Sequence, residues 1–81
     1  MSRRLAAVRG TVLLRALLRA GFVEVRVVGS HHFLRHPSGR AVSVPVHGSR
    51  DVPRGLLAQI LDDAGLTADE LRNLLRPGPR R

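Results

Sequence analysis

One stretch decides the fold of this chain: FVEVRVVGSHHFLRHPSGRAVSVPV, residues 22–46. It contains three runs with strand character, at 22–28, 31–36 and 40–46. Valine dominates the first and third runs, and β-branched residues favour strands. The segments between the runs, Gly-Ser and Pro-Ser-Gly, consist of turn-forming residues. The pattern predicts three consecutive antiparallel strands joined by two tight turns.

The third run shows which side of the sheet is covered. Val42, Val44 and Val46 alternate with Ser43 and Pro45, so one face of this strand is apolar and the other is not. A half-buried strand has this alternation. Proline has no N–H to donate to a neighbouring strand, so Pro45 predicts a sheet edge at that end.

Sequence patterns typical of helices precede and follow the three strand segments. Before them, apolar residues at 12–18 follow helical spacing, with Thr11 as the expected N-cap and Gly21 as the left-handed terminator. After a polar loop at 47–51, a second helix is expected to take Pro53 as its first residue. Its apolar stripe contains Leu56, Leu57, Ile60, Leu61 and Ala64, and Gly65 ends it. Thr67 and Glu70 fit a capping box that starts a short third helix.

These elements predict an α+β fold with the order α-β-β-β-α and a short C-terminal helix. A three-stranded antiparallel sheet would pack one face on the two main helices and leave the other face open. This layout is typical of double-stranded-RNA-binding domains, although a fold alone does not assign a function. Residues 1–75 are expected to form one domain, and the Pro- and Arg-rich residues 76–81 a disordered basic tail.

The charge of the chain points to a polyanionic partner. It has 14 basic residues, all arginine, against six acidic ones, a net charge of +8. Arginine presents a planar fork of donors that matches phosphate geometry. Solubility alone is an alternative reason for the excess charge, and codon usage for the choice of arginine. RNA or DNA is favoured over a membrane because no long basic amphipathic face and no long apolar run is evident. Without cysteine, a cytoplasmic protein is the expectation.

The histidines are the residues best suited to move protons near neutral pH. His31 and His32 are neighbours on a strand, so they are expected to point to opposite faces. His32 and His36 share a face but lie about 13 Å apart, too far to bind one zinc ion, so no metal site is expected. If the second hairpin turns near Ser38 or Gly39, His47 returns to the Gly-Ser-His corner.

Six segments in series give the chain a resemblance to a known family. They are LLRAGF (17–22), GSHH (29–32), RHPSGR (35–40), VPVHG (44–48), PRGLL (53–57) and ILDDAGL (60–66). In this order and spacing, the chain resembles the HicA toxins, mRNA interferases of bacterial toxin–antitoxin pairs. The family often has lysine among its basic residues, whereas this chain has none.

The resemblance implies a fold like a double-stranded-RNA-binding domain and cleavage of mRNA without a required metal or other cofactor. It implies one essential histidine in the Gly-Ser-His motif, which corresponds to His31. It also implies a type II system, with a HicB-type antitoxin that binds the toxin and masks the active site.

Candidate site residues follow from this chemistry. His31 is the expected catalytic residue, acting as base or acid when the 2′-hydroxyl of RNA attacks the adjacent phosphorus. Arg26, Arg35 and Arg40 are candidates to stabilise charge on the phosphate. Ser30 is expected to shape the corner or to contact phosphate. His47 is either a second proton-transfer group or a phosphate ligand.

Two alternatives to a nuclease use the same fold and charge. A non-catalytic double-stranded-RNA-binding module needs no histidine at the corner, but such modules carry a basic cluster at the start of their last helix. That start holds only Arg54, after Arg50 in the preceding loop. The other alternative is a repressor acting together with its antitoxin. In that case DNA contact is expected from the partner, with no direct DNA binding by this chain alone.

Overall fold

The computed structural model describes residues 7–76. Its elements are β1 (Val8–Arg9), α1 (Gly10–Arg19), β2 (Val23–Val28), β3 (His31–Arg35), β4 (Ala41–Pro45), β5 (Asp51–Val52), α2 (Arg54–Ala64) and α3 (Ala68–Leu75). The predicted tail lies outside the described residues, apart from Arg76, which caps the end of α3. Within residues 7–76, no helix has both the length and the apolar character needed to cross a membrane.

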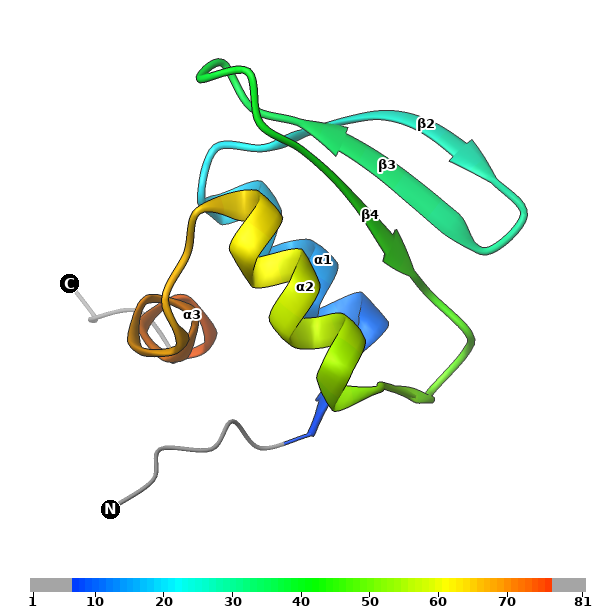
Figure 1. Cartoon of the computed structure of the whole chain (residues 1–81). Coiled ribbons are helices and arrows are strands. Elements are labelled where there is room, and N and C mark those ends of the chain that lie inside the picture. Colours follow the sequence, from blue (N-terminus) through cyan, green and yellow to red (C-terminus); the bar gives the residue numbers. More distant parts are fainter. Residues whose placement is uncertain (1–6, 77–81) are drawn as a thin grey trace, which may run out of the picture.

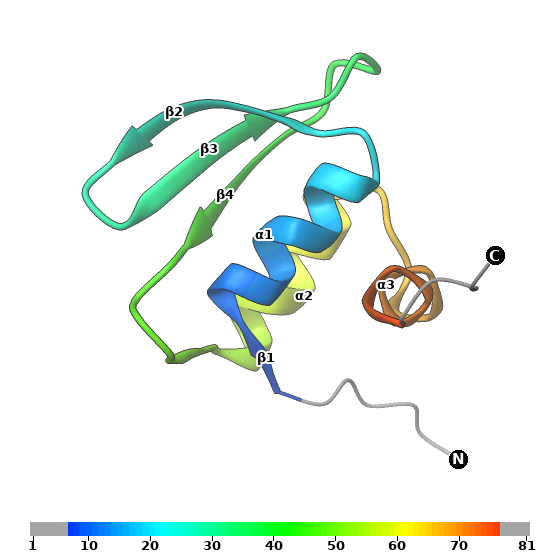
Figure 2. The ribbon, with the colours of Figure 1, turned by 180° about the vertical axis from the view of Figure 1, so that it is seen from behind.

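The main sheet has the order β2-β3-β4, with both pairs antiparallel. Helices α1 and α2 lie side by side against one face of it, and α3 packs across them on the side away from the sheet (Figure 1). Seen from behind, the other face of the sheet again carries none of the three helices (Figure 2). The predicted α+β fold and its α-β-β-β-α order are confirmed.

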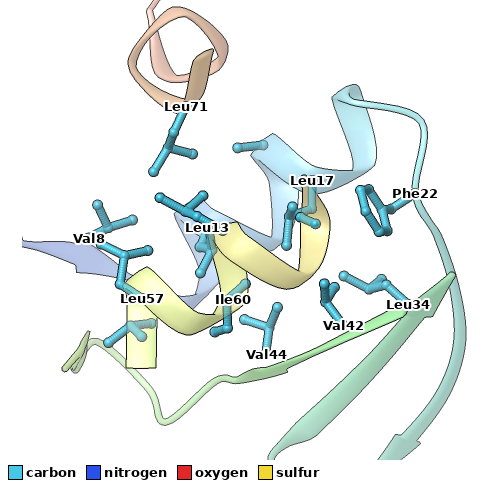
Figure 3. Packing of buried hydrophobic residues seen from close by; sticks show 14 residues of the cluster. Val8, Leu13, Leu17, Phe22, Leu34, Val42, Val44, Leu57, Ile60 and Leu71 are labelled. Carbon is cyan, nitrogen blue, oxygen red and sulfur yellow. The ribbon is translucent and has the colours of Figure 1, made fainter. Parts of the chain in front are cut away.

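The core lies between the helix pair and the sheet and continues between the helix pair and α3 (Figure 3). Its largest fully buried side chains come from all three helices and from β3 and β4: Leu13, Leu17, Leu34, Leu57, Leu71 and Val44. Each such side chain stabilises the fold by roughly 1.5–3 kcal/mol relative to an exposed one. By contrast, every residue of β2 is exposed, so β2 is held by its pairing with β3 rather than by burial.

The end of α1 is fixed by local sequence, as expected. Gly21 has φ of 102°, a conformation that costs glycine little. Its N–H donates to the carbonyl of Leu18, and the N–H of Phe22 donates to that of Leu17. These are the two hydrogen bonds of a Schellman motif, and they turn the chain from α1 into β2.

The start of α1 differs from the expectation. Thr11 lies inside the helix; Arg9 is at the N-cap, and its side chain makes no capping hydrogen bond. The reason is tertiary: Arg9 is extended because β1 pairs with β5, Arg9 opposite Asp51. Gly10 then lies against β4, where an added Cβ would stand 2.3 Å from the Pro45 carbonyl oxygen. The end of the predicted polar loop, Asp51, is accordingly part of strand β5.

The other two helices follow their predicted signals closely. Pro53 is the N-cap of α2 rather than its first residue, and Gly65 ends the helix with φ of 73°. Leu56 is 39% exposed and does not join the buried stripe. The capping box of α3 is confirmed: the Thr67 hydroxyl accepts from the Glu70 N–H, and the Glu70 carboxylate accepts from the Thr67 N–H.

Candidate functional site

The turn between β2 and β3 projects beyond the helices (Figure 1). Gly29 takes φ of 59° at the first position of this two-residue loop, a conformation that hairpin turns require and glycine supplies. The chain leaving β4 runs alongside the turn, since the N–H of Val46 donates to the carbonyl of Ser30 at 2.8 Å. Two segments far apart in sequence therefore meet at this corner.

Three polar side chains meet there. The rings of His31 and His47 lie edge to face with their centroids 6.3 Å apart. The Oγ of Ser30 is 3.4 Å from the Nε2 of His47. All three residues are accessible to solvent, with His31 and His47 exposed and Ser30 partly so. The expectation that His47 returns to the Gly-Ser-His corner is met.

His31 and His32 point to opposite faces of the sheet, as strand alternation predicts. His31 pairs with Pro45, whereas His32 pairs with Val44, whose side chain is fully buried on the helix side. The Nδ1 of His32 lies 2.5 Å from a carboxylate oxygen of Glu24. His32 is therefore engaged on the side away from His31.

A bulge in β2 accounts for the position of Glu24. The pairing with β3 shifts between Glu24 and Arg26, so Glu24 lies opposite the buried Leu34 instead of Arg35. The shift turns its carboxylate to the helix side of the sheet, within reach of His32. Glu24 is the one acidic residue of β2, β3 and β4. The open face of these strands therefore carries no carboxylate of its own.

The contacts of His36 indicate a structural role. Its Nδ1 accepts from the Ser38 N–H at 3.0 Å and lies 2.8 Å from the Ser38 hydroxyl. Its ring packs 5.0 Å from that of Phe22. These contacts hold the second hairpin turn against the end of α1, at the opposite end of β3 from His31.

Two of the three predicted arginines lie on the open face. Arg26 is opposite Phe33, and its guanidinium carbon stands 4.9 Å from the centre of that ring. Arg35 lies on the same face at the far end of β3, about 13 Å from His31 along the strand. Together with His31 they form a row of cationic or protonatable groups along the sheet.

The comparison with known families agrees with this arrangement. A family model described as the HicA toxin of bacterial toxin–antitoxin systems matches residues 11–66, more than half of the chain. The chain belongs to the HicA toxin family. The matched segment includes the corner at Ser30 and His31, the arginines of the open face, and His47. No match is found among curated proteins.

As a HicA toxin, the protein is the toxin of a toxin–antitoxin pair, which implies an antitoxin partner. Its corner combines a histidine, a second imidazole and a hydroxyl, so it can give and take protons at an accessible surface. Within residues 7–76 of this HicA toxin, no three His, Asp or Glu residues cluster closely enough to bind a metal ion. No carboxylate in this range bonds to His47, so Ser30 and His47 lack the acid of a hydrolase triad.

Arg40 is not brought to the corner of this HicA toxin. It follows the second hairpin turn, and its guanidinium donates to the carbonyl of Asp63 at 3.2 Å. The same guanidinium lies against Gly65, where an added Cβ would be 2.6 Å from its central carbon. Arg40 thus binds the C-terminal end of α2, where a cation is favoured by the helix dipole.

Phe33 is one of only two aromatic residues of this HicA toxin, with Phe22, and this scarcity predicts RNA contacts to phosphates and shape rather than to stacked bases. Yet Phe33 is two residues from His31 on the same strand, so simple alternation places both side chains on one face. The signal was present in the sequence.

Proposed function

We propose that this toxin is an endoribonuclease that cleaves mRNA at the corner formed by Ser30, His31 and His47. One observation carries the proposal: the His31 and His47 rings stand 6.3 Å apart on a solvent-accessible surface. Two imidazoles at this spacing can contact opposite sides of one phosphodiester. Membership of the HicA family supports the same conclusion.

The chemistry needs no group beyond the RNA and these side chains. One imidazole takes the proton of the 2′-hydroxyl while the 2′-oxygen forms a bond to phosphorus. The bond from phosphorus to the 5′-oxygen breaks, and the second imidazole, in its protonated form, gives that oxygen a proton. The products are a 2′,3′-cyclic phosphate and a 5′-hydroxyl. Each positioned proton-transfer group contributes typically 10²–10⁴-fold to such a rate.

His31 is the essential residue in this proposal, and His47 the second proton-transfer group. The Ser30 hydroxyl, 3.4 Å from the Nε2 of His47, orients that ring or bonds a phosphate oxygen. Arg26 and Arg35 stabilise the negative charge on the reacting and neighbouring phosphates. Arg40, held by the Asp63 carbonyl, instead positions α2 against the hairpin.

Charge distribution favours RNA at this face. The net charge is +8, and the strand carboxylate, Glu24, is turned to the other side of the sheet. The remaining acidic residues, Asp51, Asp62, Asp63, Asp69 and Glu70, belong to β5, α2 and α3. A face with more cationic groups than carboxylates attracts the phosphate backbone, and Asp63 is the one acidic residue that borders its hollow.

The same surface suggests how the antitoxin inhibits the toxin. Because no helix of the described residues 7–76 covers the corner or the open face, a HicB-like partner can inhibit by lying over them and excluding RNA. The toxin is then active only after release from that partner.

The test is incubation of the purified toxin with RNA in the presence of EDTA. We expect fragments that end in a 2′,3′-cyclic phosphate and begin with a 5′-hydroxyl. Binding without any product over hours would reject the nuclease and favour a non-catalytic RNA-binding module. The start of α2, with Arg54 as its one basic residue, offers little to support such a module.

A further inference from the structure

Phe33 occupies an unusual place for an aromatic side chain. It lies on the sheet face that the helices of the described chain leave open, and it is only partly buried. It stands two residues from His31 on the same face of β3, about 6.6 Å along the strand. That separation is comparable to one nucleotide step of an extended RNA strand.

The surroundings of the ring combine cationic and polar side chains with apolar ones, among them Val25, Leu34 and Val42. Arg26 places its guanidinium 4.9 Å from the ring centre, so the two side chains form a stacked pair. Ser43 is the strand partner of Phe33 on β4. A hollow of about 530 Å³ is lined by these three residues together with Arg35, Asp63 and their neighbours. This volume is in the range of small-ligand sites.

We propose that this hollow is a subsite for one unpaired nucleobase next to the scissile phosphate. The base stacks on the Phe33–Arg26 pair, as bases stack on aromatic rings and guanidinium planes in single-stranded RNA recognition. The Ser43 hydroxyl and the Asp63 carboxylate line the hollow and can bond the base edge, although the Oδ1 of Asp63 already accepts from the Gln59 amide at 3.0 Å. Arg35 can bind the next phosphate. A paired base has both faces covered by its neighbours and cannot stack here.

The inference rests on the proposed nuclease function and deepens it: the substrate is single-stranded RNA, with a base bound beside the cleaved bond. It requires no cleavage to be tested. Short 2′-O-methyl RNA has no 2′-hydroxyl to attack phosphorus, so binding can be measured by fluorescence anisotropy without turnover. The same strand annealed to its complement supplies the double-stranded ligand.

Four proteins make the comparison: the parent, Phe33→Ala, Phe33→Leu and the control Val27→Ala. Val27 is an exposed valine of β2 that points to the helix side and does not line the hollow. Loss of base stacking weakens binding about 5- to 150-fold. We expect a loss in this range for single strands with Phe33→Ala and a smaller one with Phe33→Leu. Duplex binding, and single-strand binding by Val27→Ala, should stay at the parent level.

Circular dichroism of each variant checks that the fold is kept, and Phe33→Leu serves if the alanine variant does not fold. Equal losses for single strands and duplexes, or no loss with Phe33→Leu, would overturn the subsite. So would a parent protein that binds duplex as tightly as single strands, or that binds neither. Apart from a parent protein that binds neither ligand, none of these results bears on whether His31 cleaves RNA, so the two proposals can fail separately.

Discussion

The Nε2 of His47 lies 3.4 Å from the Oγ of Ser30, although the two residues are 17 positions apart and separated by a complete hairpin. The register of β3 and β4 creates this proximity, since His31 is opposite Pro45 and the chain continues past the turn to His47. A slip of one residue would reverse the faces of β4 and bury polar groups in the core. The fold therefore fixes the second imidazole at the corner.

The role of His47 predicts a change in pH dependence as well as rate. Two imidazoles that act in opposite protonation states give a rate that falls on both sides of an optimum. His47→Gln should lower RNA cleavage on the order of 10²-fold and remove one limb of the rate–pH profile. The control is His32→Gln, on the opposite face, which should keep the parent profile. An unchanged two-limbed profile in His47→Gln would mean that His47 moves no proton.

Substitutions of Arg26 and Arg40 should differ in their effect on the salt dependence of RNA binding. Arg26→Ala removes a cation from the open face, so the slope of log K against log salt should decrease by about 1. Arg40→Ala should leave that slope unchanged, because its guanidinium is engaged with the Asp63 carbonyl. It should instead lower the free energy of unfolding by about 0.5–1.5 kcal/mol. Equal changes of slope in the two variants would contradict this division.

Replacing Gly10 or Gly55 by alanine should have opposite effects on the free energy of unfolding. Gly10→Ala would place a Cβ 2.3 Å from the Pro45 carbonyl oxygen, so α1 and β4 must move apart. Overpacking of this kind costs typically 1–3 kcal/mol. Gly55→Ala meets no atom within 4 Å and lies in α2, where alanine favours the helix by up to about 1 kcal/mol. The free energy of unfolding of both variants can be measured in urea. A Gly10→Ala variant as stable as the parent would contradict the close approach of α1 to β4.

The capping box of α3 predicts a cost for losing the Thr67 hydroxyl. Thr67→Ala leaves the Glu70 N–H without its acceptor, and such losses cost about 1 kcal/mol. Thr67→Ser retains the hydroxyl and should stay near the parent stability. Because α3 supplies the fully buried Leu71, fraying of its first turn should appear in hydrogen exchange before global unfolding. Equal protection in both variants would contradict the role of the cap.

Features set by neighbouring residues could be predicted from the sequence. The turn at Gly29, the helix ends at Gly21 and Gly65, and the cap at Thr67 each depend on a few adjacent side chains and backbone angles. The split of His31 from His32 needed only the two-residue period of a strand. The order of the elements followed from the same local signals.

Features set by distant contacts could not be predicted. The pairing of Arg9 with Asp51 has no local signature, because each of these strands is two residues long. Because of this pairing, α1 begins at Gly10, and Thr11 lies inside the helix instead of at its N-cap. The bulge in β2 turned Glu24 toward His32, and the Arg40 guanidinium donates to the Asp63 carbonyl. These contacts arise only once the helices pack on the sheet.

The most direct test of catalysis by His31 is the rate of RNA cleavage by His31→Ala in buffer with EDTA, measured beside the parent and His32→Gln. Binding of 2′-O-methyl RNA by all three proteins provides the control for folding and affinity. We expect cleavage at least about 10²-fold slower for His31→Ala, with binding retained, and a near-parent rate for His32→Gln. Cleavage by His31→Ala at the parent rate would contradict this expectation.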